Sequence, residues 1–366
     1  MTTIIRATDS AEFLGLIPAL AGCTPRRSLV LLPFEENRSY GVMRLDLPRP
    51  DTPLAELVAS LIGMICRVPH TDAVAIVVYD DVALDDARLP WTELVDALAD
   101  RAEACELRVV DRICVGADAW ACYGEDGLHP LSEIPAAPTV PGIGDVSIDQ
   151  HHGAELPPVD AQERRNVSAA LDALRGVLDE RLAGQELSEG RHNPQALDAA
   201  ARLDDVPAFF ERMLEPAEAR DPFDLAALAW CLNRPLFRDV ALVQWARDQR
   251  EGLRALGAQL AYRDRAAAIP ESLGGTLLGA GPRPDPDRLR NAQELARRLA
   301  PQLDGTDRVG PLVAAAWLSW ALGRSTHAAA HIEQALALSP EHSMANLLAS
   351  VLHAGLLPDW AFTRRR

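Results

Sequence analysis

Two adjacent carboxylates follow an apolar, β-branched run in the first third of the chain. Asp80 and Asp81 come directly after residues 73–79 (AVAIVVY), and Asp85 and Asp86 follow shortly afterwards. In an open α/β sheet, ligands bind beyond the carboxyl ends of the parallel strands, and clustered carboxylates there can hold Mg²⁺ through their oxygens. Acidic residues after a strand also commonly cap helices or stay solvated. Because no histidine, asparagine or phosphate-binding loop accompanies them, Asp80 and Asp81 are candidate ligand-binding residues without an assigned metal.

An arginine and an aspartate alternate along a second strand-like segment. Arg44 and Asp46 lie two residues apart in 40–47 (YGVMRLDL), so in a strand both side chains project from the same face. One interpretation is a structural ion pair on a half-exposed strand. The other is that the pair, near the end of its strand, orients a polar ligand.

Basic residues also precede the first strand-like run. Pro25, Arg26 and Arg27 lead into SLVLLPF, which begins at Ser28. They could present two guanidinium groups to an anion, although a turn into the strand accounts for the same residues. The candidate ligand-binding residues are therefore Arg27, Ser28, Arg44, Asp46, Asp80 and Asp81. No catalytic residue, metal ligand or cofactor is assigned.

Other patterns that support catalysis are missing from the sequence. His327 and His331 have the four-residue spacing at which two imidazoles can share a metal, but three alanines separate them where a His-Glu-x-x-His motif needs a glutamate. We therefore expect two partly exposed helix histidines. The chain has no Gly-x-Ser-x-Gly elbow and no Gly-x-Gly-x-x-Gly fingerprint. It also contains no lysine, since all 36 basic residues are arginines, which excludes Walker-A phosphate loops and Schiff-base chemistry.

Charge and cysteine usage limit the partners and the compartment. The 53 acidic residues outnumber the 36 arginines, giving a formal net charge of −17 that repels nucleic acid and anionic lipid. The six cysteines show no Cys-x-x-Cys spacing and are expected to be reduced thiols. The N-terminus lacks the pattern of a signal peptide, and no apolar run is long enough to span a bilayer. We expect a cytoplasmic protein without nucleic-acid or membrane partners.

The elements that must position these residues are predicted from apolar periodicity. Strand-like runs occupy 28–34, 40–47, 73–79 and 107–116, and helical patterns lie at 54–65 and after Pro90. Crossover helices between the later strands predict a partly parallel sheet, whereas the short link EENRS favours an antiparallel hairpin. The first 135 residues therefore predict a mixed α/β domain.

The remainder of the chain has a helical pattern. Residues 136–160 are rich in proline and glycine and indicate a linker or long loop, and 161–366 predict an all-helical domain, so the whole is of the α/β or α+β class. Within 307–357, spaced glycine, alanine and proline residues resemble a tetratricopeptide hairpin. One and a half repeats are too few for a solenoid, so we expect helical hairpins docked on the preceding helices.

Several segments together resemble an actinobacterial family of uncharacterised proteins defined by a domain of unknown function. They are ATDSAEFLGLIPALAGCTPRRSLVLLPF, the strand end RLDLP, AVAIVVYDD, AWACYGEDGLHPL and RPLFRD at 234–239, continuing into the hairpins at 317–358. The resemblance covers most of the chain. It implies a bacterial cytosolic protein and no particular activity.

Two hypotheses of function follow. The favoured one is a cytosolic binding or adaptor protein without catalytic activity, which contacts a protein partner through its C-terminal helical hairpins. The alternative is a small-molecule-binding protein or metal-dependent enzyme with its site at the carboxyl ends of the N-terminal sheet.

Overall fold

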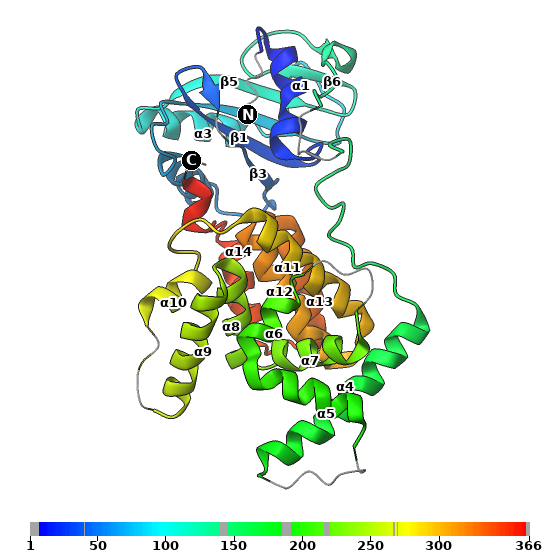
Figure 1. The fold of residues 1–366 in the computed structure, drawn as a ribbon. Coiled ribbons are helices and arrows are strands. Elements are labelled where there is room, and N and C mark those ends of the chain that lie inside the picture. The colour runs from blue at the N-terminus through cyan, green and yellow to red at the C-terminus, as the bar shows by residue number, and fades with distance from the viewer. Residues whose placement is uncertain are drawn as a thin grey trace. The chain divides into compact units, whose positions relative to one another are not determined.

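The structure, a computed structural model, describes residues 7–39, 41–139, 145–184, 192–215, 220–265, 268 and 270–363. The chain divides into an N-terminal unit, Met1–His152 with Phe362–Arg366, and a helical unit, Gly153–Ala361. A mixed sheet with helices is followed by a helical part, as the sequence predicts (Figure 1). None of the helices in the described ranges is both long and apolar enough to cross a lipid bilayer.

The N-terminal unit is built on a mixed sheet in which the strands run in the order β2-β1-β4-β5-β6-β7, with β3 also paired to β1. The strand β4 runs parallel to β5, and every other pairing is antiparallel. The strands are β1 (Ser28–Glu35), β2 (Arg38–Ser39), β3 (Met43–Asp46), β4 (Ala73–Tyr79), β5 (Arg108–Val115), β6 (Ala119–Cys122) and β7 (His129–Pro130), and a short 3-10 helix η1 (Leu131–Glu133) follows.

Helices connect and cover these strands. The helix α1 (Ser10–Ala21) starts at Asp9, whose side chain accepts a hydrogen bond from the backbone of Glu12. It contributes Leu14 and Ile17 to an apolar core shared with β1 and β4. The crossover from β4 to β5 is made by α3 (Thr92–Ala104), and α2 (Leu54–Cys66) precedes β4 and packs against α3. The predicted parallel pair and antiparallel hairpin are both present.

The helical unit begins its helices with repeated cap signals. Asn193, Asp221 and Asp285 each accept backbone hydrogen bonds at a helix start, with proline as the next residue. The helices are α4 (Ala161–Leu182), α5 (Pro194–Arg202), α6 (Val206–Arg212), α7 (Pro222–Leu232), α8 (Pro235–Ala246), α9 (Gln249–Arg263), α10 (Glu271–Leu277), α11 (Pro286–Leu299), α12 (Val309–Ala321), α13 (Ser325–Leu338) and α14 (Ser343–His353), with 3-10 turns η2 (Leu203–Asp205), η3 (Ala300–Gln302), η4 (Gly305–Arg308) and η5 (Asp359–Phe362).

The core of the helical unit is α12, in which every residue is buried. It packs against α11 and α13, and also against α7, α8 and α14. A helix covered on all sides has no polar face, which is why its sequence, VGPLVAAAWLSWA, is apolar except for Ser319. The helices α12, α13 and α14 lie in the span where hairpins are expected, and their similarity to tetratricopeptide hairpins stays a prediction.

The start of α12 lies against the end of α7. A Cβ atom added to Gly310 would lie 2.5 Å from the carbonyl carbon and oxygen of Leu232 and 2.7 Å from the backbone nitrogen of Asn233. These neighbours are backbone atoms, so they cannot move aside as a side chain could. Only glycine fits where the two helices approach so closely.

We expect Gly310→Ala to lower the free energy of unfolding by about 3 kcal/mol, the upper range for overpacking a core. Gly257→Ala is the matched control, because Gly257 also lies in a helix but a Cβ there meets no atom within 4 Å. That control should be neutral or slightly stabilising. Urea unfolding of both variants measures the difference, and equal stabilities would contradict the proposed close contact.

Candidate functional site

Three neighbouring strands bring the predicted site residues to one end of the N-terminal sheet. Ser28, at the start of β1, pairs with Asp46 of β3 on one side and with Tyr79 of β4 on the other. Asp80 and Asp81 continue from β4 at this same end. It is also the carboxyl end of the parallel strands β4 and β5. The sequence-based candidates from β1, β3 and β4 are therefore neighbours.

Arg44 connects several of these residues. One guanidinium nitrogen, Nη1, lies 2.8 Å from Oδ1 of Asp46 and donates to Oγ of Ser28 at 3.0 Å. The Arg44 side chain is only 13% exposed, and Ser28 is buried. Oγ of Ser28 in turn donates to the carbonyl oxygen of Arg26 at 2.8 Å, which also accepts from Nε2 of Gln150. The interpretation of Arg44 and Asp46 as an ion pair on one strand face agrees with this geometry.

The two aspartates after β4 point to different partners. Asp81 forms an ion pair with Arg26 at 3.2 Å. Oδ2 of Asp80 accepts a 2.6 Å hydrogen bond from Nε1 of Trp91, and its Oδ1 accepts from the backbone of Asp81. Asp80 therefore fixes Trp91, which precedes α3 with a positive φ of 63°. The side chain of Arg27 is exposed and, among the described residues, forms no hydrogen bond or ion pair with the other members of the cluster.

The chemistry of this strand end favours structure over catalysis. The Ser28 hydroxyl donates its proton to a backbone carbonyl and accepts from a guanidinium, so no base activates it. Burial raises the pKa of the nearby Cys23 thiol, while Arg44 lowers it and Asp149 raises it. Among the described residues, no three His, Cys, Asp or Glu side chains come together to hold a metal ion. The cluster is best described as a set of ion pairs and hydrogen bonds.

Arg26, Gln150 and Trp91 are the members of this cluster that sequence reasoning did not select. Gln150 reaches Arg26 across 124 positions, and no local pattern marks such a contact. The sequence predicts Arg26 only as part of an anion site with Arg27, whereas in the structure it pairs with the carboxylate of Asp81, which follows β4. For Trp91, the only sequence signal of its contact with Asp80 is that the tryptophan follows this aspartate by 11 positions.

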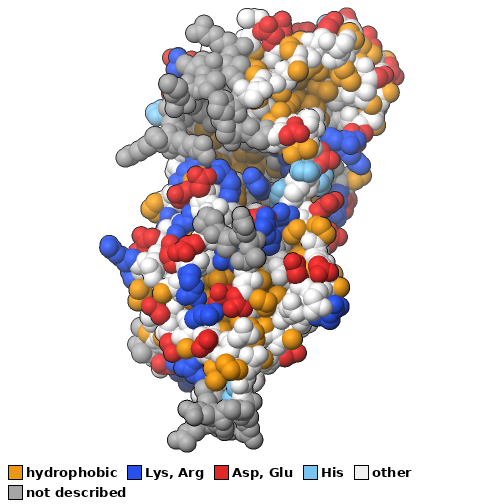
Figure 2. Space-filling model, turned by 45° about the vertical axis from the view of Figure 1, so that its right-hand side comes forward, with side chains coloured by type: hydrophobic (Ala, Val, Ile, Leu, Met, Phe, Trp, Pro, Cys, Tyr) orange, Lys and Arg blue, Asp and Glu red, His pale blue; other side chains and the backbone are white. Residues whose placement is uncertain are grey.

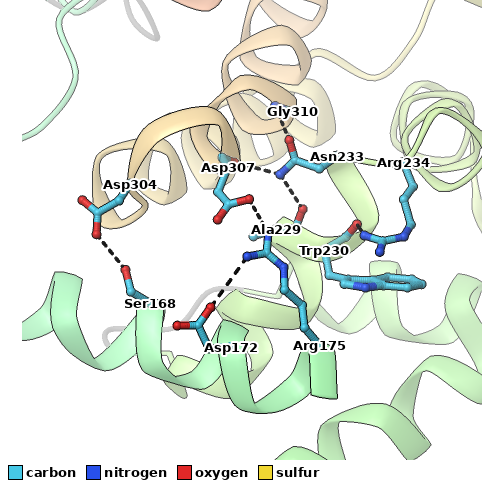
Figure 3. A network of polar contacts seen from close by, with 10 residues as sticks. All are labelled: Ser168, Asp172, Arg175, Ala229, Trp230, Asn233, Arg234, Asp304, Asp307 and Gly310. Atoms are coloured by element: carbon cyan, nitrogen blue, oxygen red, sulfur yellow. Dashed lines mark hydrogen bonds and ion pairs between the residues drawn. The ribbon is translucent and has the colours of Figure 1, made fainter. Parts of the chain in front are cut away.

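A second polar network lies inside the helical unit, where α4, α7 and the start of α12 meet (Figure 3). Arg175 of α4 pairs with Asp307 of η4 and with Asp172 one turn away. Ser168, also on α4, donates to Asp304 at 3.0 Å. These contacts hold η4, the turn that leads into α12, against α4.

The residues after α7 complete this network. The side-chain amide of Asn233 donates to the carbonyls of Ala229 and Asp307 and accepts from the backbone of Gly310 at 2.9 Å. The guanidinium of Arg234 lies over the Trp230 ring, 3.6 Å from its centre (Figure 3). Arg234 is the first residue of the RPLFRD segment, so this part of the family resemblance falls on a structural joint between helices.

The histidines four residues apart on α13 are buried, and the expectation that they are partly exposed is wrong. His327 is 9% exposed and His331 is fully buried because α13 packs on α12. Neither ring nitrogen of His331 has a hydrogen-bond partner among the described residues. Burial, together with the charges of His327 and Arg297, lowers the pKa of His331 to about 4. His331 is therefore a neutral core residue at neutral pH.

A groove of about 590 Å³ lies in the described part of the helical unit. Its floor is apolar, formed by the buried side chains of Val167, Met213, Leu225 and Leu295. Polar and charged residues surround this floor, from α4, α11 and the segment before α7. They are Glu163, Asn166, Glu215, Arg220, Asn291, Glu294, Arg297, Arg298 and Gln302.

The charges of the groove are only partly neutralised. Burial acts to raise the pKa of Glu294, but hydrogen bonds from Arg298 and Arg297 bring it below its ordinary value. Arg220 is different, because within the described ranges it has no carboxylate at ion-pair distance. Its guanidinium donates to the carbonyl of Glu215 and to the sulfur of Met213. Burial lowers the pKa of Arg220 below its ordinary value, although the charges of Asp224 and Glu215 act to raise it.

Comparison with known proteins gives one family. The family model described as a domain of unknown function, DUF4192, matches residues 11–280 and 283–359. No curated protein and no solved structure matches the chain.

We expect Arg44→Gln to destabilise the N-terminal unit by about 2 kcal/mol, because it leaves Ser28 and Asp46 without their charged donor. Arg27→Gln is the control, since that exposed side chain should change the stability by less than about 0.5 kcal/mol. Chemical unfolding measures both variants. If Arg44→Gln were as stable as Arg27→Gln, the strand-end network would have no structural role.

The burial of His331 predicts a loss of stability in acid. Its pKa is about 4 in the folded protein and 6.5 in the unfolded chain, so the unfolded state gains a proton first as the pH falls below 6.5. The stabilisation present at neutral pH is lost between pH 6.5 and 4, and amounts to about 3 kcal/mol for this group.

His331→Leu should flatten this part of the pH dependence, as measured by urea unfolding at several pH values. Replacing the exposed His353 with Gln should leave the slope unchanged. An unaltered slope in His331→Leu would show that His331 is protonated equally in both states.

Proposed function

Because the chain belongs to the DUF4192 family, whose domain has no assigned function, no activity is carried over from its relatives, and we propose that it is a binding or adaptor protein rather than a catalyst. The observation that supports this proposal is the groove of about 590 Å³ in the helical unit. Its residues come from separate helices but together form one continuous lining. Nothing in that lining resembles a nucleophile with its base.

The lining favours an extended peptide as the ligand. The apolar floor can receive an aliphatic side chain, as in most ligand-binding clefts of proteins. Amide side chains such as Asn291 and Gln302 can donate to and accept from a peptide backbone. The basic and acidic side chains around the floor then select the charge of the peptide.

Arg220 makes an acidic peptide the better match. Glu294 pairs with both Arg297 and Arg298, so those three residues together carry one net positive charge. The guanidinium of Arg220 has further N–H groups that can donate hydrogen bonds to a carboxylate of the partner. Its partly buried position strengthens these charge-assisted hydrogen bonds. We infer that the partner is a protein that presents an acidic residue beside an aliphatic one.

We place this interaction in the groove rather than on the hairpins at 307–357. The groove is lined by α4, α7 and α11 and the segments beside them, whereas α12 is buried on every side. In this proposal α13 and α14 cover α12 and thereby support the helices that form the groove. The C-terminal hairpins act as scaffold, and the partner binds next to them.

A ligand site at the carboxyl ends of the N-terminal sheet is the alternative. In its favour, Ser28, Arg44 and Asp46 lie at one end of the sheet and are linked by hydrogen bonds. Against it, Asp46, Asp80 and Asp81 each already have a partner within the protein. A ligand there would have to displace existing ion pairs, so we favour the groove.

We further propose that the protein acts in the cytoplasm of an actinobacterium and does not bind nucleic acid. Support for the compartment comes from the cysteines, which are free thiols. The net charge of −17 opposes binding to phosphate backbones.

A photo-crosslinking residue at Asn291 tests the groove in cells. We expect it to capture a reproducible protein partner, and Arg220→Glu to reduce that capture at least tenfold through charge repulsion, about 1.4 kcal/mol or more. Arg263→Glu is the matched control, because Arg263 is exposed on α9 outside the groove. Quantitative mass spectrometry measures the captured protein.

Two outcomes would contradict this proposal. One is that crosslinking at Asn291 recovers no protein above the level of a crosslinker on α9, although the chain is folded and abundant. The other is that Arg220→Glu and Arg263→Glu reduce the capture equally, since a general effect of charge would then explain the loss.

A further inference from the structure

Two of the six cysteines lie near one another in the N-terminal unit. Cys66 is the last residue of α2 and Cys105 directly follows α3, so the two helices bring their C-terminal ends together. The thiols of Cys66 and Cys105 are close enough to interact with each other. Cys66 is exposed and Cys105 is partly exposed, so reagents in solution can reach the pair.

The other four cysteines do not share this arrangement. Cys114 and Cys231 are buried, which keeps oxidants away from them. Cys23 and Cys122 are partly exposed, but the groups that act on their thiols are carboxylates, an arginine or a hydroxyl, and not a second sulfur. Only Cys66 and Cys105 combine access with a neighbouring thiol.

We propose that Cys66 and Cys105 are a site of oxidative modification, at which a peroxide converts the two thiols into a reversible disulfide bond. Thiols that lie near each other at the ends of two packed helices can approach to the bonding distance of about 2.05 Å. The bond would join the ends of α2 and α3, which already pack against each other.

The chemistry balances with one peroxide per pair. The thiolate of one cysteine attacks a peroxide oxygen, breaks the O–O bond and becomes a sulfenic acid, releasing water after protonation. The second thiolate attacks the sulfenic sulfur, forms the S–S bond and expels a second water in the same way. Both sulfurs are oxidised, both peroxide oxygens are reduced, and a dithiol reductant reverses the change.

The pKa of Cys66 affects how readily the proposed disulfide bond forms and is reduced. Burial, and then the neighbouring Cys105 thiol, raise the pKa of Cys66, while Arg101 lowers it. A dithiol pair becomes a strong oxidant when its reduced form is stabilised as a thiolate. Because the raised pKa disfavours the thiolate of Cys66, the disulfide should resist reduction as an ordinary disulfide does. The raised pKa slows the first attack, and an equilibrium measurement is therefore the suitable test.

The test uses the full chain, treated with hydrogen peroxide or equilibrated in glutathione buffers of increasing oxidation at pH 8. After acid quenching and alkylation, peptide mass spectrometry should find the Cys66 peptide joined to the Cys105 peptide while Cys23 and Cys122 remain free. Cys66→Ser and Cys105→Ser should each abolish the joined peptide. Cys122→Ser should retain it, and a dithiol reductant should remove it.

A comparison of folded and urea-unfolded wild-type protein separates the effect of the fold from that of the sequence. The link should form in a less oxidising glutathione buffer when the chain is folded, because the structure holds the two sulfurs together. The proposal is overturned if Cys66 accumulates only as a glutathione adduct or a sulfinic acid. Equal formation of the link in folded and unfolded protein would also overturn it.

Discussion

The complete burial of α12 is the constraint on which the helical unit depends. A helix covered on all sides requires close neighbours, and Gly310 provides the closest approach, against the backbone of Leu232. Polar groups on such a helix must find partners inside the protein. The hydroxyl of Ser319 donates to the carbonyl of Ala315, and the indole N–H of Trp317 donates to Leu277 in α10. The arrangement of α7, α10 and α11 follows from these requirements.

Charged residues serve two purposes in this protein. At the strand ends of the N-terminal unit, Arg26 and Arg44 are matched to carboxylates, and little charge remains for a ligand. On the helical unit, basic, acidic and apolar side chains are interspersed over the visible face (Figure 2). There Arg220 lies in a groove without a carboxylate partner among the described residues. Both regions contain arginines and carboxylates, and they differ in whether each arginine forms an ion pair within the protein.

The sequence predicted the strands well where apolar residues form unbroken runs. The predicted strand at 73–79 matches β4, since both faces of that strand are buried and every residue is apolar or small. The strands β6 and β7 were missed because they are short and contain few β-branched residues. Burial of His331 could not be foreseen, since helical spacing places a residue on a face but does not tell what covers it. For the same reason, the contact of Gln150 with Arg26 has no local signal.

The absence of lysine has a consequence for the ion pairs described above. In the described ranges every such pair uses a guanidinium or an imidazole as its cation, and most, such as Arg44 with Asp46 and Arg288 with Glu211, use arginine. A guanidinium keeps its charge far above the pH at which an ammonium group loses its proton. Alkaline conditions that break lysine-based pairs therefore leave the arginine pairs intact, whereas acid separates them by protonating the carboxylates.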